Sequence, residues 1–315
     1  MQTFPARYTL RALLEDYAAH RRPVVVALVV VTRGSSYRKA GALALIDKDG
    51  LVCGCISGGC LEAELVDAAL RVLASGVDAR LRLDTRTDED RWFGSQSGCR
   101  GEVDLLLMAG AAGGRHRLLE ALLKAAVARH SLRVLVDLEA AVPTSRIGDN
   151  PAASNEIAVR IDPVPRVLLL GGGPEAPPLI ELARTLGWWL EVVEHRGRYL
   201  AQARLAAADR VHCARSCEAL EALLTEGFDA VICATHLFEE DRHCLELLAT
   251  STVPLIGVLG PVVRGQELLG ELSREQRSAL DGRVHAPFGI ALGAYGPESV
   301  ALSIAARLTE AFARG

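Results

Sequence analysis

The sequence predicts an α/β protein in two parts, an N-terminal mixed α/β domain followed by a C-terminal doubly wound parallel sheet. The first observation is a regular alternation of short apolar runs and helical patterns from residue 166 onward, which is typical of parallel sheets. The second is a glycine-rich turn directly after the first of those runs. The third is that the first half mixes hairpin and helix patterns in no such order.

In the first domain, apolar spacing predicts helices over residues 8–20, 60–73 and 118–127. Strands are expected from residue 24 and over 42–46, 51–56, 81–83, 103–108 and 132–138. The Asp-Gly step between two of these strands predicts a hairpin turn at residues 47–50.

Prolines, glycines and asparagines interrupt the pattern between residues 141 and 165. We therefore predict an N-terminal domain over residues 1–145, a junction over 146–165 and a C-terminal domain over 166–315. In the last of these, strands are expected at 166–170, 190–194, near 211, at 230–234 and at 254–258. Helices are expected between and after these strands. One ends near residue 186, one lies around residue 200, and three span residues 217–225, 237–249 and 298–313.

Composition and charge exclude several classes of protein. The net charge of −4 and the pI of about 6.1 argue against nucleic-acid partners and against binding to anionic membranes. The apolar run at residues 24–31 is far shorter than the roughly 20 residues of a membrane span, so we expect a buried strand there and no membrane span. Eight cysteines in a chain without a recognisable signal peptide predict reduced thiols and a cytoplasmic protein.

The glycine turn carries the candidate nucleotide-binding residues. Gly171, Gly173 and Ala176 follow the G-x-G-x-x-A spacing of a Rossmann-like strand-to-helix turn, and Glu194 ends the next strand where an acidic residue would hold a ribose hydroxyl. However, Pro174 removes an amide donor, and Glu175 adds negative charge where a pyrophosphate would sit. NAD(P) therefore remains a less favoured cofactor.

Two glycine-flanked cysteines are the candidate binding residues of the first domain. We expect the N-terminus of the predicted helix to lower the pKa of the Cys60 thiol. Arg100, next to Cys99, is expected to lower the pKa of that thiol in the same way. The loop amides could cradle an anion, and the two soft thiolates suit molybdenum-bound sulfur, a persulfide or zinc; the cysteines lack C-x-x-C spacing and have no His nearby, which argues against zinc. No residue is assigned a catalytic role. The predicted binding residues are Ser57, Gly58, Gly59, Cys60, Glu62, Cys99 and Arg100, with Arg33 and Arg38 as further anion contacts.

Several motifs together resemble the XdhC/CoxI family of accessory proteins for molybdenum hydroxylases. In the first half they are residues 32–42, 57–62 and 98–101. In the second half they are the Gly171 turn and residues 234–236, 256–260 and 285–289. The match extends in order over nearly the whole chain. It departs from the family pattern at Arg100, where glycine is usual, and at Pro174, Pro261 and Ala291, where His, Ser and Asp are usual.

The resemblance implies a chaperone rather than a turnover enzyme. Such a protein binds molybdenum cofactor, supports its sulfuration by a cysteine desulfurase and inserts it into a hydroxylase of the xanthine dehydrogenase or carbon monoxide dehydrogenase type. The resemblance also implies a homodimer. Two alternatives stay open: an NAD(P)-dependent oxidoreductase that uses the Rossmann-like domain, and a non-catalytic scaffold that docks desulfurase to hydroxylase.

Overall fold

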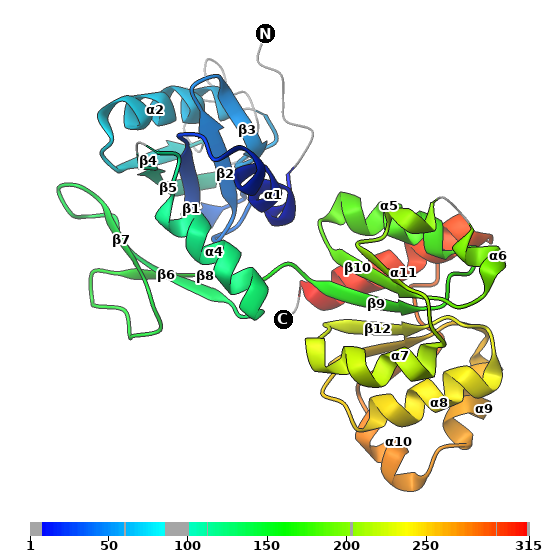
Figure 1. Ribbon diagram of the computed structural model, residues 1–315. Coiled ribbons are helices and arrows are strands. Elements are labelled where there is room, and N and C mark those ends of the chain that lie inside the picture. The colour runs from blue at the N-terminus through cyan, green and yellow to red at the C-terminus, as the bar shows by residue number, and fades with distance from the viewer. Residues whose placement is uncertain are drawn as a thin grey trace. The chain divides into compact units, whose positions relative to one another are not determined.

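The computed structural model describes residues 8–59, 61–85, 101–111, 113–201, 204–293 and 295–313 (Figure 1). The chain forms two compact units that divide between Pro163 and Val164. The first unit is mixed α/β with antiparallel sheets, and the second is a parallel doubly wound sheet, so the predicted fold class is confirmed.

A five-stranded antiparallel sheet in the order β3-β2-β1-β5-β4 forms the centre of the first unit. Its strands are β1 (Val25–Gly34), β2 (Leu43–Asp47), β3 (Gly50–Gly54), β4 (Ala79–Asp84) and β5 (Gly101–Ala109). The predicted hairpin at residues 47–50 joins β2 to β3. Both faces of the sheet are covered, so most residues of β1 and β5 are buried. This is why these strands carry long apolar runs in which apolar and polar residues do not alternate.

Helices cover both faces of this sheet. α2 (Glu62–Ser75) packs its apolar side, including Leu65 and Ala69, on one face. α1 (Leu10–His20) and α4 (Arg117–Ala128) pack on the other face, together with a second, three-stranded sheet. All three helices and the strands of the five-stranded sheet lie where apolar spacing predicts them, within a few residues.

The three-stranded sheet corrects the predicted junction at residues 146–165. Its strands β6 (Leu132–Asp137), β7 (Thr144–Ile147) and β8 (Ile157–Ile161) pair in the order β7-β6-β8. Val159 and Ile161 of β8 are buried in the core of the first unit. Most of the predicted junction therefore belongs to the first unit, because two short strands lie between the prolines and glycines that suggested a linker.

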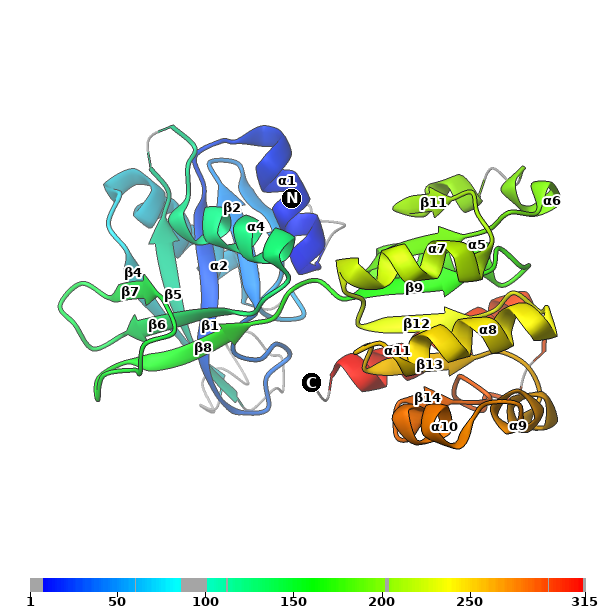
Figure 2. The same ribbon diagram turned by 60° about the horizontal axis from the view of Figure 1, so that its bottom comes forward.

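The second unit is a six-stranded parallel sheet in the order β11-β10-β9-β12-β13-β14 (Figure 2). This is the strand order of a dinucleotide-binding fold. Successive strands are added to one side of β9 as far as β11 and then to its other side from β12 onward, while all strands stay parallel. The strands are β9 (Arg166–Leu170), β10 (Trp189–Val193), β11 (Arg210–His212), β12 (Ala230–Cys233), β13 (Leu255–Val258) and β14 (Val284–His285). The last of them was not predicted, because two residues give no periodic signal.

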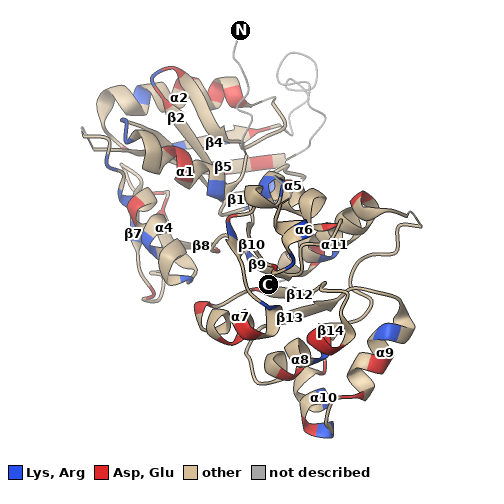
Figure 3. Cartoon of the chain, turned by 45° about the vertical axis from the view of Figure 1, so that its right-hand side comes forward, with Lys and Arg blue, Asp and Glu red and all other residues tan. Residues whose placement is uncertain are grey.

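Helices lie on both sides of the parallel sheet. α5 (Ala176–Leu186) and α11 (Pro297–Phe312) share one core with it. α7 (Ser216–Leu223), α8 (Phe238–Ala249), α9 (Val262–Gly270) and α10 (Arg274–Leu280) pack on the other face. The short α6 (Gly197–Leu200) follows β10. Helices α9 and α10 each carry charges of both signs (Figure 3). Among the described residues, no helix is long and apolar enough to cross a bilayer.

Candidate functional site

The three sequence motifs of the first unit meet one edge of the five-stranded sheet. Because the strands are antiparallel, β1 and β3 end at the same edge at which β5 begins. Gly34 and Gly101 face each other there as register partners. A Cβ at position 101 would overlap the carbonyl oxygen of Ser35, so only glycine fits where these two segments pass. Cys60, Cys99 and Arg100 themselves lie outside the described residues.

The loop that leads into α2 is closed by its own carboxylate. Glu62, which is 3% exposed, accepts hydrogen bonds from the backbone amides of Ser57 at 2.9 Å and Ile56 at 3.3 Å, and from the Ser57 hydroxyl. The Ser57 hydroxyl oxygen in turn accepts from the amides of Gly59 at 3.2 Å and Leu61 at 3.1 Å. These amides are therefore engaged, contrary to the anion cradle that the glycines suggested.

Gly58 is the exception in this loop. It is exposed, and a Cβ added there would meet nothing within 4 Å. Within the described part of the chain, its amide donates to no other group. Gly58 is therefore the residue of this loop whose amide has no partner among the described residues.

The predicted anion contact Arg33 is anchored on two buried carboxylates. Its Nη1 lies 2.6 Å from Glu102 Oε1 and 3.3 Å from Asp104 Oδ2, and both carboxylate side chains are 1% exposed. The Arg33 side chain is itself 53% exposed, so the guanidinium is held in one place and still faces solvent. Sequence reasoning missed this pairing, because Arg33 lies on β1 and the carboxylates lie on β5.

Two further arginines of β4 share these carboxylates. Arg82 Nη2 lies 2.6 Å from Glu102 Oε1, and Arg80 Nη2 lies 2.9 Å from Asp104 Oδ1. The predicted contact Arg38 is half-buried in the loop between β1 and β2. Burial raises the pKa of the Cys55 thiol, and Arg38 partly opposes this, which puts Arg38 close to the segment that leads to Cys60.

In the second unit, the glycine turn lies between β9 and α5 as predicted. A Cβ at Gly171, whose φ is +118°, would overlap the carbonyl oxygen of Ala234. Ala176 is fully buried, which lets α5 pack close to the sheet. The geometry of the fold therefore requires small residues at both positions, whether or not a nucleotide binds.

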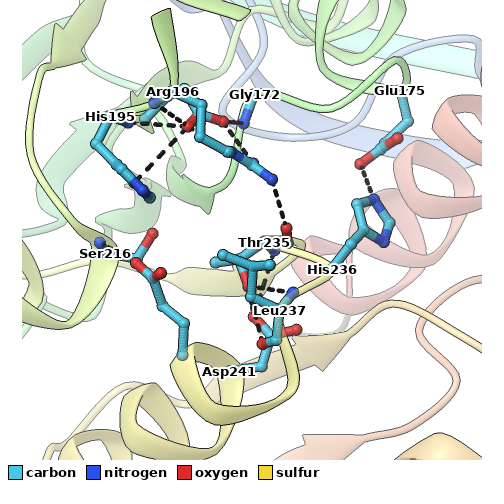
Figure 4. A network of polar contacts seen from close by, with 11 residues as sticks. Gly172, Glu175, His195, Arg196, Ser216, Thr235, His236, Leu237 and Asp241 are labelled. Carbon is cyan, nitrogen blue, oxygen red and sulfur yellow. Dashed lines mark hydrogen bonds and ion pairs between the residues drawn. The ribbon is translucent and has the colours of Figure 1, made fainter.

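Glu194, the expected ribose contact, is fully engaged by the protein. Its Oε2 accepts from the amide of Gly172 at 2.7 Å and from Arg196 Nη2 at 2.6 Å. Its Oε1 accepts from the amides of His195 and Arg196 and from Arg196 Nε. Arg196 also donates from Nη1 to the carbonyl oxygen of Thr235 at 2.9 Å (Figure 4). Arg196 thus joins the ends of β10 and β12 across the point where strand order reverses.

The position of a pyrophosphate is occupied by a second carboxylate. Glu175 is 6% exposed, and a Cβ at Gly173 would lie 2.6 Å from its Oε1. Glu175 Oε1 also lies 2.9 Å from Nε2 of His236, a non-glycine residue with a φ of +61°. The hydrogen bond with Glu175 raises the pKa of His236, and burial of the imidazole partly offsets this rise. The residues present therefore do not fit the pyrophosphate of NAD(P).

A buried ion pair between Asp241 and Arg264 links the loops that follow β12 and β13. Asp241 accepts from the Thr235 hydroxyl at 2.7 Å, and its other oxygen lies 2.6 Å from Arg264 Nη2. Arg264 Nη1 donates to the carbonyl oxygen of Leu259, which follows β13. Asp241 is fully buried and the Arg264 side chain is 18% exposed. The loops after β12 and β13 are thereby fixed to each other.

Comparison with known sequences identifies the family of the chain. Residues 17–84 match the sequence model of the XdhC and CoxI family, and residues 167–308 match that of the XdhC Rossmann domain. The chain belongs to the XdhC and CoxI family. Both matches fall on segments whose motifs resemble it, one in each compact unit.

Two curated proteins and one solved structure are similar to the chain over more than half of its length. It is 27% identical to a probable xanthine dehydrogenase subunit of Bacillus subtilis, over 96% of each chain. It is 30% identical to the molybdenum cofactor insertion chaperone PaoD of Escherichia coli, over 58% of this chain and 56% of PaoD. The crystal structure of a xanthine dehydrogenase from Bacillus halodurans has a TM-score of 0.80 and 25% identity, over 99% of this chain and 96% of that one.

Three of the positions at which this XdhC chain departs from the family pattern lie in its Rossmann domain. Pro174 is exposed beside Gly173, Pro261 precedes α9, and Ala291 is exposed after β14. None of these side chains can donate or accept a hydrogen bond. The Rossmann domain of this XdhC protein therefore lacks three polar groups that the family pattern leads one to expect.

The Glu194–Arg196 pair makes a prediction about acid stability. Burial alone would raise the pKa of Glu194, but hydrogen bonds from Arg196 and from the amides of Arg196 and Gly172 lower it from 4.5 to about 2. The pKa is lower in the folded state, so the stabilisation is complete above the unfolded pKa and is lost as the pH falls through the folded one. Between pH 4.5 and 2, we expect the melting temperature to fall more steeply for the parent than for Glu194→Gln. Parallel slopes would contradict the pairing.

Proposed function

We propose that this chain is a chaperone that binds molybdenum cofactor in its first unit and inserts it into a molybdenum hydroxylase of the xanthine dehydrogenase or carbon monoxide dehydrogenase type. The family assignment carries this proposal, because one relative within the family is a molybdenum cofactor insertion chaperone and another is named as a probable part of xanthine dehydrogenase. The first unit offers exposed guanidinium groups, on Arg33 and Arg82, that could contact an anionic cargo.

Topology is consistent with a single binding site made from both cysteine loops. β3 and β5 are separated by two strands, so their ends lie about 14 Å apart at the usual strand spacing. Cys60 follows the end of β3 by six residues, and its neighbours Gly59 and Leu61 are both held by the Ser57 hydroxyl near that end of the sheet. Cys60 and Cys99 would offer sulfur to the metal centre, and Arg33, Arg38 and Arg100 would contact the anionic end of the cofactor.

The proposed role also involves other proteins. A cysteine desulfurase would sulfurate the cofactor while the chaperone protects it, and an apo-hydroxylase would then accept it. We propose a cytoplasmic homodimer, in which two copies present their cysteine loops to these partners. Light scattering at micromolar concentration separates a dimer of this 33.6 kDa chain from a monomer.

An NAD(P)-dependent oxidoreductase is a weaker alternative. Glu194 and Glu175 already occupy the places of ribose and pyrophosphate contacts, and opening them would break the pairs with Arg196 and His236. A docking scaffold without cofactor is a third alternative, which differs from the proposed chaperone only in whether cofactor binds.

Calorimetry with the full chain tests the proposal against both alternatives. We expect molybdenum cofactor, added anaerobically, to bind measurably, and NAD and NADP to give no heat of binding under the same conditions. Tight nicotinamide binding without cofactor binding would favour the oxidoreductase. The absence of binding by all three would favour the scaffold.

A further inference from the structure

One corner of the Rossmann crevice contains a buried carboxylate oxygen without a donor. Glu240 lies in the first turn of α8, is 4% exposed, and accepts from the amide of Ser216 through Oε1 at 2.7 Å. Among the described residues, its Oε2 has no hydrogen-bond partner. Arg215 Nη2 lies 3.8 Å from this oxygen, which is beyond hydrogen-bond distance. A buried acceptor without a hydrogen bond is costly, so this oxygen can take a donor from a ligand or from water.

This corner lies where a doubly wound sheet binds the nucleoside part of its ligands. Ser216 follows β11, and Glu240 follows β12, so both lie beyond the carboxyl ends of parallel strands. Figure 4 shows His195, Arg196, Ser216 and Thr235 around this end of the sheet, with Glu175 and His236 to one side. Glu175 and Glu240 therefore lie after different strands, β9 and β12, at the same end of the sheet.

The basic side chains around this corner differ in how exposed they are and in how strongly they are already paired. Arg196 is committed to Glu194 and the carbonyl oxygen of Thr235, and its side chain is 17% exposed. The Arg215 side chain is 58% exposed, and it pairs with Glu240 only through the long contact of 3.8 Å. The His195 side chain is 34% exposed. Arg215 is therefore the most exposed of these side chains and can contact an anionic group.

We propose that this corner binds a mononucleotide whose base carries an exocyclic amine, as adenine and cytosine do. The amine would donate to Glu240 Oε2, because a carboxylate accepts hydrogen bonds and donates none. Arg215 would contact the phosphate. A dinucleotide is excluded because Glu175 fills the place of its pyrophosphate. Only the part of the site that would hold a single nucleotide is therefore available. Its ligand is separate from the cofactor proposed for the first unit.

Calorimetry of the full chain with four mononucleotides tests this inference. IMP carries a carbonyl oxygen where AMP has its exocyclic amine, and UMP is likewise the deaminated counterpart of CMP. We expect AMP or CMP to bind at least about tenfold more tightly than its deaminated counterpart, since a site built for a donor rejects an analogue that lacks it. Comparing AMP with CMP identifies the base. NAD is expected to give no heat of binding, because Glu175 fills the place of its pyrophosphate.

The variant Glu240→Gln sharpens the test. Its amide oxygen can still accept from Ser216, while its amide nitrogen turns a donor toward the ligand. We expect it to favour IMP or UMP, whose carbonyl oxygens accept hydrogen bonds. Glu239→Gln is the matched control, because that neighbouring side chain is 78% exposed and should leave the preference unchanged.

The inference is wrong if none of the four mononucleotides binds the parent chain at millimolar concentration. It is also wrong if both amine-bearing nucleotides bind as their counterparts do. These outcomes are independent of cofactor binding by the first unit, which the same protein preparation can be assayed for in parallel.

Discussion

Replacing Cys60 or Cys99 by serine is expected to lower retention of molybdenum cofactor by at least about tenfold, which corresponds to roughly 1.4 kcal/mol. Serine nearly preserves the volume of cysteine but removes the soft sulfur that a molybdenum centre or its sulfur ligand would contact. Because we propose that the two cysteine loops form a single site, either loss should weaken cofactor binding at that site. The measurement is the cofactor dissociation constant of each variant under anaerobic conditions.

Cys213→Ser is the matched control for these variants. Cys213 is an exposed free thiol of the second unit, and its replacement should leave cofactor retention unchanged. Equal melting temperatures for all three variants would show that folding is intact. If both Cys60→Ser and Cys99→Ser retain cofactor as the parent does, the binding site must be sought around Arg33, Arg38 or the Gly171 turn instead.

The second large effect concerns stability. Asp241→Ala is expected to destabilise the second unit by about 3–5 kcal/mol, because it leaves the largely buried charge of Arg264 without its carboxylate partner and removes the nearer acceptor of the Thr235 hydroxyl. For a unit of this size the melting temperature should fall on the order of 10 °C. Thermal unfolding followed by circular dichroism measures it.

Glu239→Ala on the same helix is the control for this prediction. Glu239 is 78% exposed and pairs with Arg242 at 3.0 Å, and exposed pairs of this kind contribute about 0–1 kcal/mol. A loss of stability at Asp241 no larger than that at Glu239 would contradict the buried pair as the element that fixes the loops after β12 and β13.

Much of the fold could be predicted from the sequence because its signals are local. β9 and α5 have an uninterrupted apolar run, a glycine turn and a helical pattern within about twenty residues. β7 and β8 could not be recognised in the same way. They are short, they carry many exposed residues, and they are strands only because β6 lies between them. Pairing partners at a distance leave no periodic signal in either segment.

The candidate sites show the same limit. Sequence reasoning placed Glu194 at the end of a strand but could not say that Arg196, two residues later, would neutralise it. It placed Glu62 beside a glycine loop, where the carboxylate closes the loop instead of leaving it open to a ligand. Glu240 was not predicted at all, since one glutamate in an acidic helical turn resembles a solvated residue. Its burial depends on the amide of Ser216 from another element.

The molybdenum and pterin content of the purified protein tests the central claim most directly. The chain should be isolated anaerobically from cells that make molybdenum cofactor, and in parallel from cells that cannot make the pterin. We predict that molybdenum and pterin accompany the protein in equal amounts from the first cells and are absent from the second. Protein from the first cells that carries neither molybdenum nor pterin would contradict its role as a cofactor chaperone.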